Sequence, residues 1–183
     1  MLGKWYAKPI AAIMAMVLLL AAGCAPDKNQ GTGAEAEKKK DELILAIGYE
    51  PEDGFDPTTG WGRYGSPLFQ STLLKRGKDL KIVNDLATGY EVSDDGLVWT
   101  VKLRSDVKFS DGQPLTADDV AYTYDTASKS GSVIDLTVLK SVEAVDPFTV
   151  KFTLVHPPST FVNILVATGI VPKHAHGEDY AKK

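Results

Sequence analysis

The sequence predicts a mixed α/β (α+β) fold in which small antiparallel sheets are interspersed with helices. Three observations support this fold class: a hairpin with one strictly alternating arm at residues 89–104, a second hairpin at 141–155, and a helix that begins after Thr116. These elements follow an N-terminal region of a different composition. The roughly 140 residues beyond that region are enough for one domain with a real core, or for a piece of something larger.

The N-terminal region has the order of charges and apolar residues found in secretory signals. Lys4 and Lys8 precede an apolar run over 10–22, which is shorter than the ~20 residues that span a bilayer. Small residues then lead into Cys24, the one cysteine of the chain. This pattern resembles the lipobox of bacterial lipoproteins, so residues 1–23 are predicted to be a lipoprotein signal peptide and Cys24 the lipidated residue. An ordinary signal peptide or an anchor helix with an incidental cysteine is the alternative.

Residues 24–42 are predicted to form a flexible tether. They include the charge-mixed stretch EAEKKKDE together with glycine, asparagine and glutamine, and this composition buries too little apolar surface to fold. Removal of residues 1–23 takes away two lysines and no acids, so the formal charge moves from -4 to -6. This acidity argues against a nucleic-acid partner, which would require a basic face.

Residues 43–183 are predicted to form the folded part of the chain, and its first elements are a strand and a hairpin. The branched apolar run 43–47 predicts a strand that is buried on both faces. A Gly- and Pro-rich loop follows, and then a possible short helix over 66–74. The segment GYEV-SDDG-LVWTVKLR predicts a hairpin in which Trp99, Val101 and Leu103 share one face with Leu97.

Two helices and a second hairpin complete the predicted elements. Thr116 and Asp119 have the spacing of a capping box, and apolar residues recur at helical spacing from Ala117 to Ala127. The segment SVEAVDPFTVKFTLV predicts a hairpin turning at Asp146-Pro147. The segment PPSTFVNILVAT predicts a helix capped by Ser159.

The loop GFDPTTGWGRYGSP carries the candidate ligand-binding residues Phe55, Trp61, Arg63 and Tyr64. Aromatic faces and a guanidinium can hold a ligand by stacking, by cation–π contact and by forked hydrogen bonds to a carboxylate. In the alternative, Trp61 and Tyr64 plug into the core and Arg63 is solvated. The GWGRYG stretch in the loop matches a dinucleotide motif only formally, because no strand directly precedes it and Ser66-Pro67 follows it.

No constellation in the sequence specifies an enzyme, a cofactor or a metal. His174 and His176 form an H-x-H pair, but two ligands do not complete a metal shell, so a structural role is favoured for both. There is no nucleophile elbow, no HExxH and no Cys-His pairing. The sequence therefore predicts no catalytic residues, no metal and no cofactor.

The stretch LATGYEVSDDGLVWTVKLRSDVKFSDGQPLTADDVAYTY resembles the signature region of the bacterial extracellular solute-binding proteins of family 5. The segments GFDPTT and GIVPKHA extend the resemblance over 43–183. It implies a type II periplasmic-binding-protein fold of two lobes that close over a solute, of which this chain would be the N-terminal part. The resemblance also implies that the loop with Phe55, Trp61, Arg63 and Tyr64 faces the cleft.

The family resemblance implies the substrate-binding component of an ABC importer that captures peptides and delivers them to a permease and its ATPase subunits. It also implies an exported protein that is anchored to the cell membrane by lipid at Cys24 and faces the periplasm or the cell exterior. Nickel or a metal complex is the alternative solute within the same family. A secreted, lipid-anchored hydrolase is the alternative from a different class.

Overall fold

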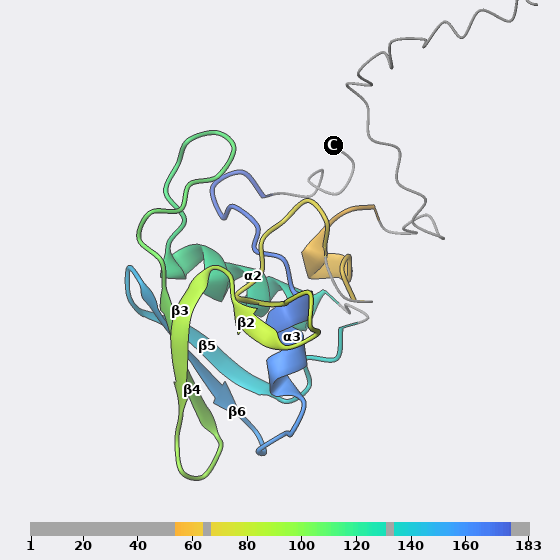
Figure 1. Ribbon diagram of the computed structural model, residues 1–183, viewed down its shortest axis with the longest axis vertical. Helices are drawn as coiled ribbons and strands as arrows, with labels where there is room; N and C mark the ends of the chain where they lie inside the picture. The colour runs from red at the N-terminus through yellow and green to blue at the C-terminus, as the bar shows by residue number, and fades with distance from the viewer. Residues whose placement is uncertain (1–53, 64–66, 131–133, 177–183) are drawn as a thin grey trace, which may run out of the picture. The chain divides into compact units, whose positions relative to one another are not determined.

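The computed structural model describes residues 54–63, 67–130 and 134–176, which lie within one compact unit of the chain. Their colours and elements are shown in Figure 1. The predicted signal peptide 1–23, the tether 24–42, the strand 43–47, Cys24 and Tyr64 lie outside the described residues. Within the described ranges, no helix has the length and apolar character needed to cross a membrane.

A four-stranded antiparallel sheet forms the centre of the described part. It consists of β3 (Ala87–Val92), β4 (Val98–Leu103), β5 (Leu139–Asp146) and β6 (Thr149–Leu154), in the spatial order β3-β4-β6-β5. Both predicted hairpins are confirmed, because β3 pairs with β4 and β5 pairs with β6. The register joins the hairpins by placing Trp99 opposite Phe152 and Val101 opposite Val150, so the apolar residues of β4 and β6 share one face.

The turn of the first hairpin shows why the chain reverses at SDDG. The Asp95 carboxylate accepts hydrogen bonds from the Ser93 hydroxyl at 2.6 Å and from the Leu97 amide at 3.0 Å. Gly96 has a φ of 70°, a left-handed conformation that glycine adopts without a Cβ clash. The turn therefore needs both the short acceptor side chain and the glycine, as the sequence predicts.

Helix α2 (Ala117–Lys129) packs on β5 and β6 and lies behind the strands in Figure 1. Its start confirms the predicted capping box, in which the Asp119 carboxylate accepts from the Thr116 amide at 2.9 Å. Ala117, Val120, Tyr124 and Ala127 are buried as expected, whereas Ala121 is only half-buried. The buried face of α2 is thus set by helical spacing.

Helix α3 (Phe161–Ala167) is confirmed, but its cap differs from the prediction. Thr160 occupies the N-cap position instead of Ser159, and it makes no side-chain capping bond. The helix is held by burial, since Phe161 and Leu165 are fully buried. Packing therefore fixes this helix where capping does not.

The predicted helix over 66–74 is wrong within the residues that the structure describes. Leu68 has a left-handed φ of 48°, and Leu74 begins strand β1 (Leu74–Arg76), which pairs with β2 (Ile82–Asn84). The backbone groups here bond to distant segments: the Leu73 carbonyl accepts from the Ala87 amide and Thr72 bridges Gly169. Tertiary pairing thus takes the hydrogen bonds that a helix would have used.

Three buried aromatic side chains of the core link the sheet to both helices. The rings of Tyr124 and Phe152 lie 4.9 Å apart in an edge-on contact, and those of Phe152 and Phe161 lie 5.6 Å apart. All three side chains are fully buried. Burial also raises the pKa of the Tyr124 hydroxyl well above its ordinary value. This core fixes α2 and α3 against one face of the sheet.

Candidate functional site

The loop 54–63 carries three of the four predicted ligand-binding residues and is built around Asp56. The Asp56 carboxylate caps the short 3-10 helix η1 (Pro57–Thr59) by accepting from the Thr58 amide and hydroxyl, both at 2.8 Å. The Asp56 carbonyl accepts from the Trp61 amide at 3.1 Å. The chain between Phe55 and Trp61 is therefore folded back on itself and held from within.

Three aromatic rings come together on this loop. The Phe55 ring meets the Trp61 ring edge-on at 4.8 Å and the Phe69 ring edge-on at 5.1 Å, while the Trp61 and Phe69 rings stack at 6.1 Å. Phe55 and Phe69 are 42% and 66% exposed. Phe69 was not among the predicted site residues, because its segment was predicted to be a helix. We call Phe55, Trp61 and Phe69 the aromatic cluster.

For Trp61 the structure agrees with the alternative interpretation, in which this side chain lies in the core. Its side chain is buried, with 6% of its surface exposed, and its indole nitrogen donates to the Pro67 carbonyl at 2.6 Å. Trp61 is therefore the buried member of the cluster, and the partly exposed rings of Phe55 and Phe69 pack against it. Arg63 is exposed at the end of the loop, as predicted.

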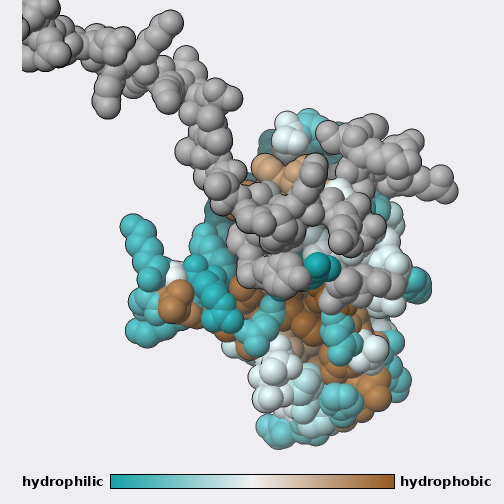
Figure 2. All heavy atoms as spheres, turned by 90° about the vertical axis from the view of Figure 1, so that its right-hand side faces the viewer, coloured by the Kyte–Doolittle hydropathy of each residue, from teal (hydrophilic) through white to brown (hydrophobic). Residues whose placement is uncertain are grey.

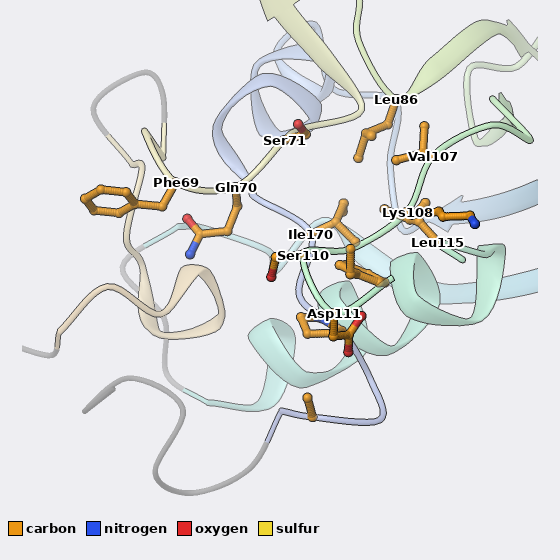
Figure 3. Close-up of a pocket in the computed structure, with 13 residues that line it drawn as sticks. Phe69, Gln70, Ser71, Leu86, Val107, Lys108, Ser110, Asp111, Leu115 and Ile170 are labelled. Carbon is orange, nitrogen blue, oxygen red and sulfur yellow. The ribbon is translucent and has the colours of Figure 1, made fainter. Parts of the chain in front are cut away.

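A cavity of about 420 Å³ opens beside the aromatic cluster and has Phe69 in its wall. Figure 3 shows Leu86, Val107, Leu115 and Ile170 gathered on one side, with Phe69 projecting away from them on the other. The remaining lining residues are mostly polar or belong to turns: Gln70, Ser71, Lys108, Phe109, Ser110, Asp111, Pro172 and Ala175. An apolar wall with a few polar groups is the usual composition of a small-molecule site.

Polar groups at this cavity come from the turn SDGQ at 110–113 and from Gln70. Asp111 pairs with His174 at 2.5 Å, and this hydrogen bond, followed by that from the Gln113 amide, lowers the pKa of the Asp111 carboxyl. The Gln70 amide nitrogen donates to the Phe55 carbonyl at 3.2 Å, while its oxygen is buried without a hydrogen-bond partner. In the sequence Asp111 was interpreted only as a turn residue, and nothing there placed it beside Gln70.

The two histidines of the H-x-H pair have different surroundings. His174 is exposed and pairs with Asp111, whereas the His176 side chain is 8% exposed and bridges Asp56 and Tyr122. Among the described residues, no three potential metal ligands come together. Tyr122, His176 and Asp56 do form a phenol–imidazole–carboxylate chain, but none of them lines the cavity.

The face of the molecule in Figure 2 shows hydrophobic residues in a band between polar ones. Exposed aromatic faces, an exposed guanidinium and a largely apolar cavity can hold a small molecule by stacking, charge and burial of apolar groups. The arrangement offers adjacent binding elements. It is suited to binding.

Three comparisons with known proteins agree. Residues 81–183 match the family model described as bacterial extracellular solute-binding proteins, family 5 Middle. The glutathione-binding protein GsiB of Escherichia coli O1:K1 is 37% identical over 150 residues, which cover 78% of this chain. The chain spans 29% of that relative's length.

Solved structures show the same likeness. The structure of NikZ from Campylobacter jejuni in complex with Ni(L-His) has a TM-score of 0.69 and 29% identity, covering 78% of this chain and 31% of NikZ. The oligopeptide-binding protein AppA from Bacillus subtilis, in complex with a nonapeptide, has a TM-score of 0.56 and 36% identity, covering 62% of this chain and 24% of AppA.

Proposed function

Because the chain belongs to the bacterial extracellular solute-binding proteins of family 5, we propose that it is part of the component of an ABC importer that captures peptides. The family comprises solute-binding proteins and not enzymes, so the alternative of a hydrolase is set aside. The predicted mixed α/β fold is confirmed: the described part has the architecture of part of a type II periplasmic-binding protein.

The aromatic cluster, of which Phe69 also lines the cavity, is the observation that supports capture at this site. A peptide that lies across Phe55 and Phe69 would stack its apolar groups on their exposed faces. A side chain of the peptide could enter the adjoining cavity, and Arg63 offers a forked donor for a carboxylate. Tyr64, outside the described residues, is proposed as a fourth contact. The peptide class is supported by two relatives whose names specify glutathione and oligopeptides.

The proposed mechanism is capture followed by delivery. Solute binds the open form, contacts that exist only on closure favour the closed form, and a permease with its ATPase subunits recognises that form. No covalent step is required. The proposed location is the outer side of the cell membrane, with Cys24 carrying the lipid and residues 24–42 spacing the domain from the bilayer. The lipobox-like sequence supports this anchor.

A metal complex is the second candidate solute, favoured by the likeness to NikZ in complex with Ni(L-His). In this candidate the metal is bound together with an organic ligand, as it is in that complex. Such a complex would offer the same recognition features as a peptide: a carboxylate for Arg63 and a flat group for the aromatic cluster.

Native mass spectrometry of the complete gene product, purified without its anchor from cells in rich medium, tests the proposal. A ladder of bound masses that match short peptides is expected. One discrete mass containing a metal would favour the second candidate, and a protein that carries no solute and binds neither glutathione nor Ni(L-His) on addition would contradict both.

Variants of the loop test the site itself. Phe55→Ala and Arg63→Ala are expected to weaken binding of the recovered peptides by about tenfold each, because each removes one proposed contact. Arg104→Ala is the matched control, since Arg104 is an exposed arginine that directly follows β4 and pairs with Asp106. Equal affinities for all three variants would show that the solute binds elsewhere.

A further inference from the structure

A buried polar network connects the solute-binding loop to two segments that are far from it in sequence. Asp56, His176 and Tyr122 are its members, separated by 120 and 54 residues along the chain. We propose that His176 is a positioning residue, which holds the Asp56 carboxylate and thereby sets the place of Phe55 and Trp61. This inference rests on the proposed function for the role of the loop, but the place of the loop can be measured without a solute.

Each ring nitrogen of His176 lies within hydrogen-bond distance of another member of the network. His176 Nε2 lies 2.9 Å from Asp56 Oδ2, and His176 Nδ1 lies 2.8 Å from the Tyr122 hydroxyl. The arrangement fits the tautomer in which Nε2 donates to the carboxylate and Nδ1 accepts the phenol proton. The side chains of His176 and Asp56 are only 8% and 6% exposed, so water does not readily replace either bond.

Asp56 is the point through which this network reaches the loop. Its other carboxylate oxygen holds the Thr58 amide and hydroxyl, and its carbonyl holds the Trp61 amide. Phe55 is its direct neighbour in sequence. The Thr58 carbonyl in turn accepts from the Ser130 hydroxyl just after α2. Displacement of the Asp56 carboxylate would therefore move both described aromatic residues of the loop.

Loss of the imidazole would have a defined consequence. A carboxylate oxygen would remain buried without its donor, and a charged group in that situation moves towards water if its segment can shift. The loop can shift more easily than the core, because the neighbours of Asp56 on the chain are a half-exposed phenylalanine and a single turn of 3-10 helix. The exposed part of the aromatic cluster would lose its fixed position.

Hydrogen exchange followed by mass spectrometry on the complete gene product tests the proposal. His176→Leu is expected to speed exchange in peptides covering 54–63 by at least tenfold and to leave β4 and β6 unchanged. His176→Gln is expected to restore most of the protection, since the glutamine amide can still donate to Asp56. His174→Leu is the matched control: it removes the exposed histidine of the same H-x-H pair, bonded to Asp111, and should leave 54–63 protected.

A second measurement connects the loop to binding. With glutathione as the probe, His176→Leu is expected to lower affinity about tenfold, and His176→Gln about threefold or less. Unchanged exchange over 54–63 in His176→Leu, or the same increase in His174→Leu, would overturn the inference. If His176→Leu does not fold, Tyr122→Phe can be used instead. It removes only the phenol hydroxyl and should still raise exchange over 54–63. Failure of the wild type to bind solute would count against the proposed function alone, because the exchange result needs no solute.

Discussion

Gly169 shows how a single residue decides the fit between the loop and the segment that follows α3. A Cβ at this position would lie 2.7 Å from the Gln70 Cβ, 3.0 Å from the Pro67 Cγ and 3.1 Å from the Pro57 Cγ. None of these atoms is the free end of a flexible side chain, so the backbone has to move. Gly169→Ala is expected to lower the free energy of unfolding by about 1–3 kcal/mol, the usual effect of overpacking. Urea denaturation of the complete gene product measures this.

Gly89 provides the control for that prediction. It lies in β3, where an added Cβ would meet no atom within 4 Å. Gly89→Ala should therefore change the free energy of unfolding by no more than about 0.5 kcal/mol, with a gain possible because alanine restricts the unfolded chain. Equal losses for the two variants would mean that the close approach at Gly169 does not exist in solution.

At the scale of elements, Asp119 joins α2 to the segment that carries both histidines. Its Oδ2 accepts from the Thr116 amide at 2.9 Å and its Oδ1 accepts from the Lys173 amide at 2.9 Å, in a buried position. Asp119→Ala removes a helix cap and leaves a second amide without its acceptor. The expected loss is on the order of 2–4 kcal/mol in the free energy of unfolding.

Asp118→Ala is the control for the cap. Asp118 also lies in the first turn of α2, but its side chain is 70% exposed and pairs with Lys173 Nζ at 3.8 Å. An exposed pair of this kind contributes at most about 1 kcal/mol. Thermal and urea unfolding should therefore separate the two neighbours clearly. Similar losses for both would indicate that the first turn of α2 acts through charge alone.

The elements that could be predicted from the sequence are those whose bonds are local. The hairpin at SDDG and the cap of α2 depend on Asp95, Gly96, Thr116 and Asp119, all within a few residues of the groups they bind. The segment 71–74 depends on pairing with 84–87 and 169–170, which no local pattern reveals.

The candidate site divides in the same way. The loop and its aromatic residues could be proposed from composition, and Phe55 and Arg63 are exposed as expected. The cavity could not be proposed, because Gln70, Asp111 and Ile170 come from three distant segments. His176 was interpreted as structural, and its bonds to Asp56 and Tyr122 show what it joins.

For the described molecule as a whole, acidification is expected to weaken the fold through its turns. The pKa values of Asp95, Asp111, Asp135 and Asp146 are lowered by hydrogen bonds, chiefly from the Ser93 hydroxyl, His174, the Thr137 hydroxyl and the Phe148 amide respectively. When the pKa of a carboxyl is lower in the folded state than in the unfolded state, the unfolded state takes up the proton at a higher pH. Its contribution is present above the unfolded pKa near 4 and is lost as pH falls through the folded values.

The free energy of unfolding should therefore stay level from neutral pH to about pH 5 as far as these groups are concerned, and fall below about pH 4. Urea unfolding of the complete gene product at a series of pH values measures the slope. Asp95→Asn should make the acid branch shallower, because it removes one titrating group while an amide oxygen can still accept from the Ser93 hydroxyl and the Leu97 amide. An acid branch as steep as that of the wild type would show that Asp95 does not bind its proton differently in the two states.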